Sequence, residues 1–275
     1  MSALDVPAFP KIDLELARRL ERAEAMASAA FVDARRVVQP DVGAEWTEIA
    51  GVYAMFDGAS SPVTQTFGLG VFDTIGQTEL DRLEAFFADR GASTQHEICA
   101  FAANEIWHSL SARGYAPIET STVLIRATAG IASSSSPNIT TRIVDEREAP
   151  LWARVSAEGW SSEAPELGAI VEQLGAVTAR ARGAHCFLAE LNGLPIAAGA
   201  LNVHNDVALL AGASTIPSAR RQGAQSALLR ARLDFAKSLG LELAMIVAQP
   251  GSASQRNALR QGFRPVYVRS KWQRS

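Results

Sequence analysis

A basic loop centred on one glycine, between a short apolar run and an amphipathic helix, constrains this chain more than any other feature. The segment 214–229 reads STIPSARRQGAQSALL, and the apolar run 207–213 precedes it. A strand that passes through such a loop into a helix start leaves backbone N–H groups facing an anion, and the helix dipole favours negative charge there. Gly223 allows close backbone approach, and Arg220 and Arg221 add positive charge. The sequence therefore predicts a diphosphate site between a strand and a helix.

The bulk composition indicates a soluble globular chain with room for two domains. It has 275 residues, 48% of them hydrophobic and 20% charged, and a net charge of −3. A charge balance so small and mixed argues against nucleic-acid binding, which usually needs a basic face. The segment 130–138 carries four consecutive serines and Pro137 without apolar periodicity, which predicts a linker. We therefore expect domains at 1–130 and 140–275, joined by a linker at 131–139.

Cysteines, histidines and the absence of long apolar segments set further limits. Cys99 and Cys186 are too few and too far apart for a disulfide framework or a zinc site, so we expect reduced core thiols. The four histidines are scattered without paired carboxylates, so no metal site is predicted. The sequence shows neither a signal peptide nor an apolar stretch of about 18 residues, which predicts a cytoplasmic protein without a membrane span.

In the second half of the chain, apolar periodicity predicts an alternation of strands and helices. Asn192-Gly193 separates two apolar runs, which is a strong hairpin signal. Gly240 fits the residue after a helix, and Ser252 with Gln255 fits a capping box. The predicted strands are 141–144, 184–191, 194–203, 206–215, 243–248 and 263–271, and the predicted helices are 149–158, 166–182, 222–239 and 252–261.

The first half of the chain shows a partial copy of this pattern. Its predicted helices are 13–36, 78–90 and 103–113, and its predicted strands are 48–56, 64–71, 96–100 and 123–126. Gly114-Tyr115-Ala116-Pro117 precedes one strand as Gly262-Phe263-Arg264-Pro265 precedes another, 148 positions later. A strand–helix–strand–helix–strand unit repeated at a near-constant offset predicts two copies of one fold, although any two α/β halves share some likeness.

The second half resembles the GCN5-related N-acetyltransferase (GNAT) superfamily over about residues 141–272. The segment Arg220-Arg221-Gln222-Gly223-Ala224-Gln225, which follows a strand, looks like that family's acyl-CoA signature, Arg/Gln-x-x-Gly-x-Gly/Ala. A short strand comes after the next helix, and the segment 252–263 with Asn257 looks like the family's closing helix and strand. The resemblance implies an α/β (α+β) protein of two tandem acyl-CoA N-acyltransferase-like domains. Each domain would be a mixed, mostly antiparallel sheet flanked by helices, and the N-terminal domain would be a degenerate copy.

By that resemblance the second domain holds acetyl-CoA through backbone groups at the strand end and the helix start. Residues 221–226 would bind the pyrophosphate, and residues 214–216 would pair with pantetheine like an added strand and polarise the acetyl carbonyl. Ser254 and Asn257 match positions that contact the cofactor in relatives. The residues expected at the acetyl-CoA site are Ser214, Thr215, Ile216, Arg220, Arg221, Gln222, Gly223, Ala224, Gln225, Ser226, Ser254 and Asn257.

Two positions depart from the family's pattern. Gln225 stands where the signature has a small residue, and Ala258 stands where many relatives have a tyrosine that acts as general acid. The candidates for proton transfer are Tyr267, the nearest tyrosine in sequence, and His204 and Asp206, which flank the turn before the signature strand. An ordinary solvated turn explains the last two as well.

In the first half, Gly68-Leu69-Gly70 with Gly76 imitates a phosphate loop. Asp73 lies inside this loop, and no basic residue occurs between Asp57 and Asp81. Because a carboxylate there repels a diphosphate, we expect an ordinary strand turn in a copy that holds no cofactor.

These observations predict an N-acetyltransferase that transfers the acetyl group of acetyl-CoA to an amine of a small molecule, a peptide or a protein. Trp160 between acidic neighbours suits a cationic amine, or else anchors a hydrophobic contact. The alternative is a non-catalytic acyl-CoA-binding or regulatory module, which Ala258 favours. A phosphate-loop nucleotide enzyme is disfavoured, because residues 220–225 lack the second glycine and the Lys-Ser/Thr ending. The sequence leaves the identity of the amine and a homodimer open.

Overall fold

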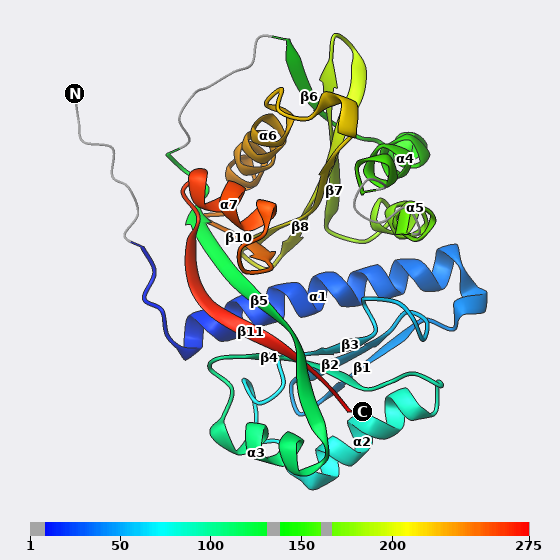
Figure 1. Ribbon diagram of the computed structural model, residues 1–275, viewed down its shortest axis with the longest axis vertical. Helices are drawn as coiled ribbons and strands as arrows, with labels where there is room; N and C mark the ends of the chain where they lie inside the picture. Colours follow the sequence, from blue (N-terminus) through cyan, green and yellow to red (C-terminus); the bar gives the residue numbers. More distant parts are fainter. Residues whose placement is uncertain (1–8, 131–137, 161–166, 275) are drawn as a thin grey trace. The chain divides into compact units, whose positions relative to one another are not determined.

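A computed structural model describes residues 9–130, 138–160 and 167–274 of the chain (Figure 1). The described residues form two compact units, which are treated separately below. Unit 1 consists of Phe9 and residues 126–246, and unit 2 consists of residues 10–125 and 247–274. The unit boundaries fall inside two strands, β5 (Tyr115–Ala127) and β10 (Leu243–Ala248).

Unit 1 is a mixed sheet with helices on both faces. Its strands are β6 (Ile139–Ile143), β7 (Ala184–Leu191), β8 (Leu194–His204), β9 (Val207–Thr215) and β10, and its helices are η2 (Glu146–Glu148), α4 (Ala149–Trp160), α5 (Leu167–Thr178), η3 (Pro217–Ala219) and α6 (Ala224–Ser238). The strand order is β10-β9-β8-β7-β6, and β9 and β10 are the parallel pair within an otherwise antiparallel sheet. Figure 1 shows α4 and α5 on one face of this sheet and α6 on the other.

Successive side chains of β7 point to opposite faces of the sheet and pack against the helices on both sides. Cys186 and Leu188 pack against Trp152 of α4. Phe187, which lies between them in sequence, points to the opposite face and contacts Phe235 of α6 edge-to-face, with ring centroids 5.7 Å apart. The apolar run of this strand is therefore buried on both faces, because a helix covers each.

The turn between β7 and β8 confirms the predicted hairpin. Asn192 and Gly193 have φ values of 51° and 81°, and Leu191 pairs directly with Leu194. Two consecutive positive φ values are what a two-residue type I′ turn requires, and Asn-Gly adopts them at low cost.

Unit 2 is built around a second mixed sheet. Its helices are α1 (Leu14–Val38), η1 (Pro40–Val42), α2 (Gln77–Ala88), α3 (Asn104–Ala112) and α7 (Ala253–Arg260), and its strands are β1 (Glu45–Ile49), β2 (Val52–Phe56), β3 (Gln65–Phe67), β4 (Gln95–Cys99), β5 and β11 (Arg264–Arg274). The strand order is β1-β2-β3-β4-β11-β5, with β3 and β4 parallel and the other neighbours antiparallel.

The long helix α1 forms much of the core of unit 2. Asp13 caps it, accepting a hydrogen bond from the backbone N–H of Leu16 at 3.1 Å. Its buried face is rich in small residues, and Ala25 and Ala29 pack against Met55 of β2. Small side chains bring the helix backbone close to the sheet, so a 25-residue helix is fixed along its length.

The two halves of the chain share one order of elements, as the repeat predicts. The hairpin β1–β2, strand β3, helix α2 and strand β4 correspond to β7–β8, β9, α6 and β10, with the same parallel pairing at the end. One predicted strand, 48–56, is instead the end of β1, a turn at Ala50-Gly51 and β2. Alanine at φ 48° gives no turn signal in a sequence, which is why the hairpin was missed. The predicted strand 64–71 is similarly shortened to β3.

The final strand β11 joins the sheet of unit 2, although it belongs to the second half of the sequence. It lies antiparallel between β4 and β5, with Arg269 opposite both Cys99 and Ser121. The compact units do not coincide with the expected sequence domains 1–130 and 140–275, because residues 247–274 cluster with the first half. As a division of the sequence into two copies, those boundaries stay a prediction; the predicted linker 131–139 lies largely outside the described residues.

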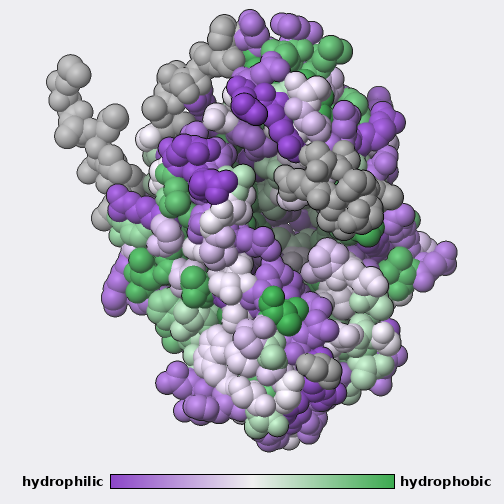
Figure 2. Space-filling model, in the orientation of Figure 1, coloured by the Kyte–Doolittle hydropathy of each residue, from purple (hydrophilic) through white to green (hydrophobic). Residues whose placement is uncertain are grey.

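No helix in the described part of the chain is long and apolar enough to cross a bilayer. On the face drawn in Figure 2, hydrophobic residues lie in small groups among hydrophilic ones. Scattered exposed apolar residues of this kind are usual on protein surfaces.

Candidate active site

A β-bulge in β9 opens the sheet of unit 1. Ala211 pairs with Ala200 and Ser214 pairs with Ala198, so Gly212 and Ala213 together oppose the single residue Gly199. Gly212 has a φ of 59°, a conformation that suits glycine. The extra residue bends the strand at this point.

The parallel neighbour of β9 leaves it just before this bulge. β10 pairs with β9 at Val207–Leu209 only, opposite Leu243–Met245. Within the described residues, the rest of β9 has β8 as its sole partner strand. An extended ligand can therefore add to this side of β9 by backbone hydrogen bonds, as a further strand would.

Beyond β9 the chain turns through a short basic loop into α6. Arg221 and Gly223 have φ values of 64° and 92°, and the side chain of Arg221 is exposed. Gly223 is the N-cap of α6, and it has no side chain that could accept from the first N–H groups of the helix. The first intrahelical bond is from Ala227 N to Gly223 O, at 3.0 Å. The N–H groups of Ala224 and Gln225 precede that bond and can face an anion. The binding of an acyl-CoA diphosphate at this loop stays a prediction.

Arg220 is turned away from the helix start. Its Nε donates to Thr215 O at 3.3 Å, and its Nη2 donates to Gly159 O at 3.1 Å. The guanidinium thus ties the loop to the end of β9 and to the last turn of α4. Its expected contact with phosphate stays a prediction.

Gln225, the large residue in the signature, bonds back to the strand. Its Nε2 donates to Thr215 Oγ1 at 2.8 Å. This bond holds the side chain toward the end of β9, where a smaller residue would leave open space. The helix still begins at Ala224, so the backbone of the helix start is retained.

The last turn of α4 lies directly against the end of β9. Ser214 Oγ donates to Ser156 O at 3.0 Å, and a Cβ built on Gly159 would lie 2.5 Å from Ser214 Oγ. Glycine is therefore required for this close approach. Trp160 follows as the final, half-buried residue of α4, so the predicted acceptor region begins beside β9.

His204 and Asp206 lie at the other end of this hairpin. Six residues of strand separate Asp206 from Gly212, which corresponds to about 20 Å. His204 is buried, and burial, with a smaller effect of Arg182, lowers its pKa. The structure therefore does not bring these two residues to the bulge.

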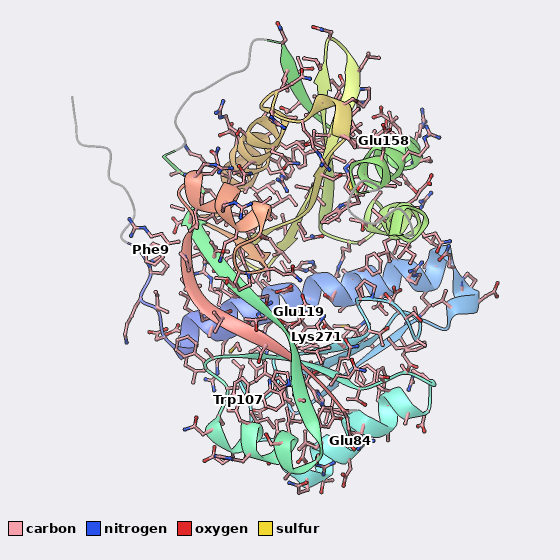
Figure 3. All side chains as sticks on the ribbon, in the orientation of Figure 1. Phe9, Glu84, Trp107, Glu119, Glu158 and Lys271 are labelled. Atoms are coloured by element: carbon pink, nitrogen blue, oxygen red, sulfur yellow. The ribbon has the colours of Figure 1, made fainter. Side chains whose placement is uncertain are left out.

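Tyr267 lies on β11 in unit 2, inside a buried polar network. Its hydroxyl donates to Glu21 Oε1 at 2.9 Å, and Arg269 Nε donates to the same oxygen at 2.7 Å. Burial and the charge of Glu21 raise the pKa of Tyr267 well above its usual value. On the same strand, Lys271 Nζ lies 3.6 Å from Glu119 Oε2 (Figure 3). The hydroxyl is already engaged in the core, so it has no part in the function proposed below.

Ser254, Asn257 and Ala258 lie on α7, which belongs to unit 2. Ser252 caps this helix, accepting from Gln255 N at 3.0 Å, but the second bond of the predicted capping box is absent, because Gln255 Oε1 accepts from Gly251 N rather than from Ser252 N. Ser254 is exposed, Asn257 is half-buried, and Ala258 is buried. Their expected relation to acetyl-CoA stays a prediction.

The glycine loop of the first half is filled by protein groups. Arg18 of α1 donates from Nε to Val71 O at 2.8 Å and from Nη2 to Phe72 O at 3.1 Å. A Cβ on Gly68 would lie 2.5 Å from the Phe72 ring. The start of α2 is also satisfied, because Glu79 Oε2 accepts from Gly76 N at 2.9 Å. The Glu79 carboxylate thus takes a helix-start N–H that a diphosphate would need, and the Arg18 guanidinium is bonded to two loop carbonyls.

Within the described residues, no group of three or more His, Cys, Asp or Glu could hold a metal ion. Cys99 and Cys186 are both buried, and burial raises the pKa of each thiol to about 12. Both are therefore core thiols that stay protonated at neutral pH.

One residue next to the bulge escaped the sequence analysis. Arg232 of α6 is buried beneath β8 and β9, where Nη1 donates to Ala200 O at 3.0 Å and to Ala211 O at 3.3 Å. The sequence signal that could have found Arg232 is its spacing. Ala224, Leu228 and Arg232 are four residues apart, which places the arginine on the buried face of the helix.

A family model matches part of the second half of the chain. Residues 147–263 match the family described as the acetyltransferase (GNAT) family. A search among curated proteins found no match.

Solved structures share the fold of nearly the whole chain. A GCN5-related N-acetyltransferase from Kribbella flavida is 17% identical with a TM-score of 0.63, and the match covers 90% of this chain and 95% of that one. A GCN5-related N-acetyltransferase from Sphaerobacter thermophilus is 16% identical, with a TM-score of 0.54 and coverage of 94% and 93%. A tandem GNAT protein from the clavulanic acid biosynthesis pathway is 11% identical, with a TM-score of 0.56 and coverage of 81% and 77%. At these identities the likeness establishes the tandem fold.

Proposed function

Residues 147–263 form a domain of the acetyltransferase (GNAT) family, and from this premise we propose that the chain is an N-acetyltransferase with acetyl-CoA as donor and an amine as acceptor. The observation that carries the proposal is the second half of β9. This half contains the bulge, does not pair with β10, and is followed by the helix start at Gly223. Together they offer an extended backbone edge and an anion cradle in series. A pantetheine arm that ends in a diphosphate has this same order of groups.

Three segments of unit 1 would hold the donor. The N–H groups around Gly223 would bind the diphosphate, and the exposed guanidinium of Arg221 would add charge. The end of β9 at Ser214 and Thr215 would pair with the pantetheine amides, whereas the Ile216 N–H donates to Ile196 O at 2.9 Å and its carbonyl accepts from Ala219 N at 3.0 Å. Backbone N–H groups near the bulge would polarise the acyl carbonyl.

The bound thioester supplies an activated acetyl group. The amine nitrogen forms the new bond to the acyl carbon while the C–S bond breaks, and the electron pair of that bond leaves with sulfur. The amine loses one proton and the thiolate gains one, so the net products are an amide and a free thiol. Because His204 and Asp206 lie about 20 Å from the bulge, we propose that water carries the proton from the amine.

The acceptor is proposed to be a cationic amine that enters beside the last turn of α4. Glu158 is an exposed carboxylate on that turn (Figure 3), and Trp160 ends it. A carboxylate and an aromatic ring together attract an ammonium group. Small-molecule, peptide and protein amines all satisfy this chemistry.

A non-catalytic acyl-CoA-binding module is the second candidate. It is favoured by Ala258, which is buried and cannot transfer a proton, at the position where the resemblance places a tyrosine. A thiol-release assay with a panel of amines separates the two functions. Binding of acetyl-CoA without turnover of any amine would establish the module.

The donor site is tested by Gly223→Glu, which places a carboxylate in the anion cradle. Wild-type protein should bind acetyl-CoA by calorimetry, and a concentration of about 100 times Kd should stabilise it by about 2.7 kcal/mol in thermal melts. The variant should lose both effects, because a fixed negative charge at the helix start repels the diphosphate.

Gly240→Glu is the matched control for this substitution. Gly240 follows the other end of α6, is exposed and also has a positive φ, of 77°. It therefore shares the backbone strain of the first variant but lies away from the cradle. Binding that survives Gly223→Glu, or that is lost equally in both variants, would contradict the placement of the diphosphate.

A further inference from the structure

Arg232 is a buried cation whose partners are all backbone carbonyls. It lies on α6 with 3% of its surface exposed, and its guanidinium donates to Leu228 O, Ala200 O and Ala211 O. Within the described residues, no carboxylate pairs with it, and burial lowers its pKa to about 10. At neutral pH it therefore remains charged. An unneutralised charge inside a protein is costly, so its place in the fold calls for an explanation.

The guanidinium lies directly under the bulge of β9. Ala200 and Ala211 are the last regular pair before the bulge, and Nη1 bridges their two carbonyls. Gly199, the single residue that opposes the bulge, makes room for the group: a Cβ there would lie 3.2 Å from the guanidinium carbon. Three features of the chain thus converge at one point: a glycine on β8, a bulge on β9 and an arginine on α6.

The peptide between Ala211 and Gly212 connects this charge to the open edge of β9. Its carbonyl accepts a hydrogen bond from Arg232, and its N–H belongs to Gly212, the exposed residue with positive φ in the bulge. A hydrogen bond to the carbonyl of a peptide polarises its N–H and makes it a stronger donor. Such a donor, with a cation behind it, stabilises negative charge more than a peptide N–H without a cation does.

We propose that Arg232 is a positioning residue for acyl transfer, which fixes the bulge of β9 and polarises its backbone donors toward the acyl oxygen of the bound thioester. This inference rests on the proposed function, since it assigns the thioester to the bulge. It explains why α6 carries an arginine on its buried face, and why the residue opposite the bulge is glycine.

The test compares Arg232→Met and Arg232→Lys with Lys237→Met. Lys237 is exposed on the same helix, so its replacement changes the net charge equally without touching the bulge. We would measure the Kd of acetyl-CoA by calorimetry and the carbonyl stretch of bound 13C-acetyl-CoA by difference infrared spectroscopy. Where the amine panel gives turnover, kcat would be measured too.

Wild-type protein and Lys237→Met should shift the carbonyl stretch to lower wavenumber than in water. Arg232→Met should lose most of that shift and lower kcat by roughly 10- to 100-fold, with Kd changed by less than about threefold. Arg232→Lys should recover part of the shift, because the charge is kept but the two-carbonyl bridge is not. If Arg232 had a purely structural role, its replacement would change the Kd of acetyl-CoA together with the carbonyl stretch, rather than the carbonyl stretch alone.

Gly199→Ala provides the second variant, in case Arg232→Met does not fold. This variant keeps the charge of Arg232, but the added methyl group pushes the guanidinium away from the bulge. The shift of the carbonyl stretch should therefore become smaller, while the circular dichroism spectrum stays that of the folded protein. An unchanged carbonyl stretch and unchanged kcat in the folded variants would overturn this inference alone. A wild-type protein that binds no acetyl-CoA would overturn the proposed function and, with it, this inference.

Discussion

Arg269 and Arg232 are both buried arginines, but their charges are balanced in different ways. Arg269 in unit 2 pairs with Glu21 and Glu24, and Tyr267 shares the Glu21 oxygen. Burial raises the pKa of Glu21, and the charge of Arg269 opposes that rise. This is a structural network, since its members neutralise one another. Arg232 has carbonyl partners only, so its field acts on the neighbouring peptides of β9.

His96 is a buried histidine that should make stability depend on pH. It is fully buried on β4, with Nδ1 2.9 Å from Thr66 Oγ1, and burial lowers its pKa to about 3. The unfolded chain takes up a proton below about pH 6.5, whereas the native chain does not until near pH 3. The free energy of unfolding should therefore fall as pH drops below 6.5, by about 2 kcal/mol at pH 5.

Urea denaturation of His96→Asn from pH 7 to pH 4 measures this contribution. Asparagine can keep a hydrogen bond to Thr66 but does not titrate, so the loss of stability toward low pH should be smaller by about 2 kcal/mol at pH 5. His108→Asn is the control, because His108 is exposed. Equal pH slopes in wild type and His96→Asn would show that His96 does not stay neutral in the native state.

At the scale of elements, short-range signals were predicted well and long-range pairings were not. The Asn192-Gly193 hairpin and the cap that Ser252 provides involve neighbours in sequence, so their chemistry is visible there. The bulge of β9 depends on the register with β8, and the open edge depends on where β10 leaves. Neither has a composition signal apart from Gly212.

The strand β11 should support unit 2. Val268 pairs with Thr122 of β5, and its carbonyl accepts from Ala100 N at 3.0 Å. Proline at 268 removes an N–H from a strand with partners on both sides, so Val268→Pro should lower the free energy of unfolding by about 2 kcal/mol or more. Val268→Ala keeps the N–H and changes a half-exposed side chain, so it should cost less than about 1 kcal/mol.

Hydrogen exchange locates the effect of this proline. Exchange should rise in β4 and β5, which flank β11, while β7 and β8 of unit 1 keep their protection. Faster exchange confined to unit 1 would contradict the assignment of β11 to unit 2.

On the scale of the whole molecule, the two copies share a fold but differ in what fills the equivalent loop. In the second copy that loop ends in Gly223 and an uncapped helix start. In the first copy Arg18 and Glu79 satisfy the loop carbonyls and the helix start. A fold repeated twice therefore need not mean a site repeated twice.

Calorimetry should accordingly find one acetyl-CoA bound per chain. A diphosphate in the first copy would have to displace the Glu79 carboxylate from the helix start and draw the Arg18 guanidinium away from its two carbonyls. Gly223→Glu should reduce the stoichiometry from one to zero. A value near two in wild type, or one remaining site in the variant, would show that the first copy binds as well.

The sequence by itself determined the signature loop, the hairpin and cap signals, and the tandem repeat, because each depends on residues close together or on a pattern repeated along the chain. Only the tertiary structure decided that β11 joins β4 and β5, that β9 is bulged and open, and that Arg232 lies beneath it. These features depend on which strands pair, in which register, and on what a helix buries. That choice is made by the packing of segments far apart in sequence, and no local pattern encodes it.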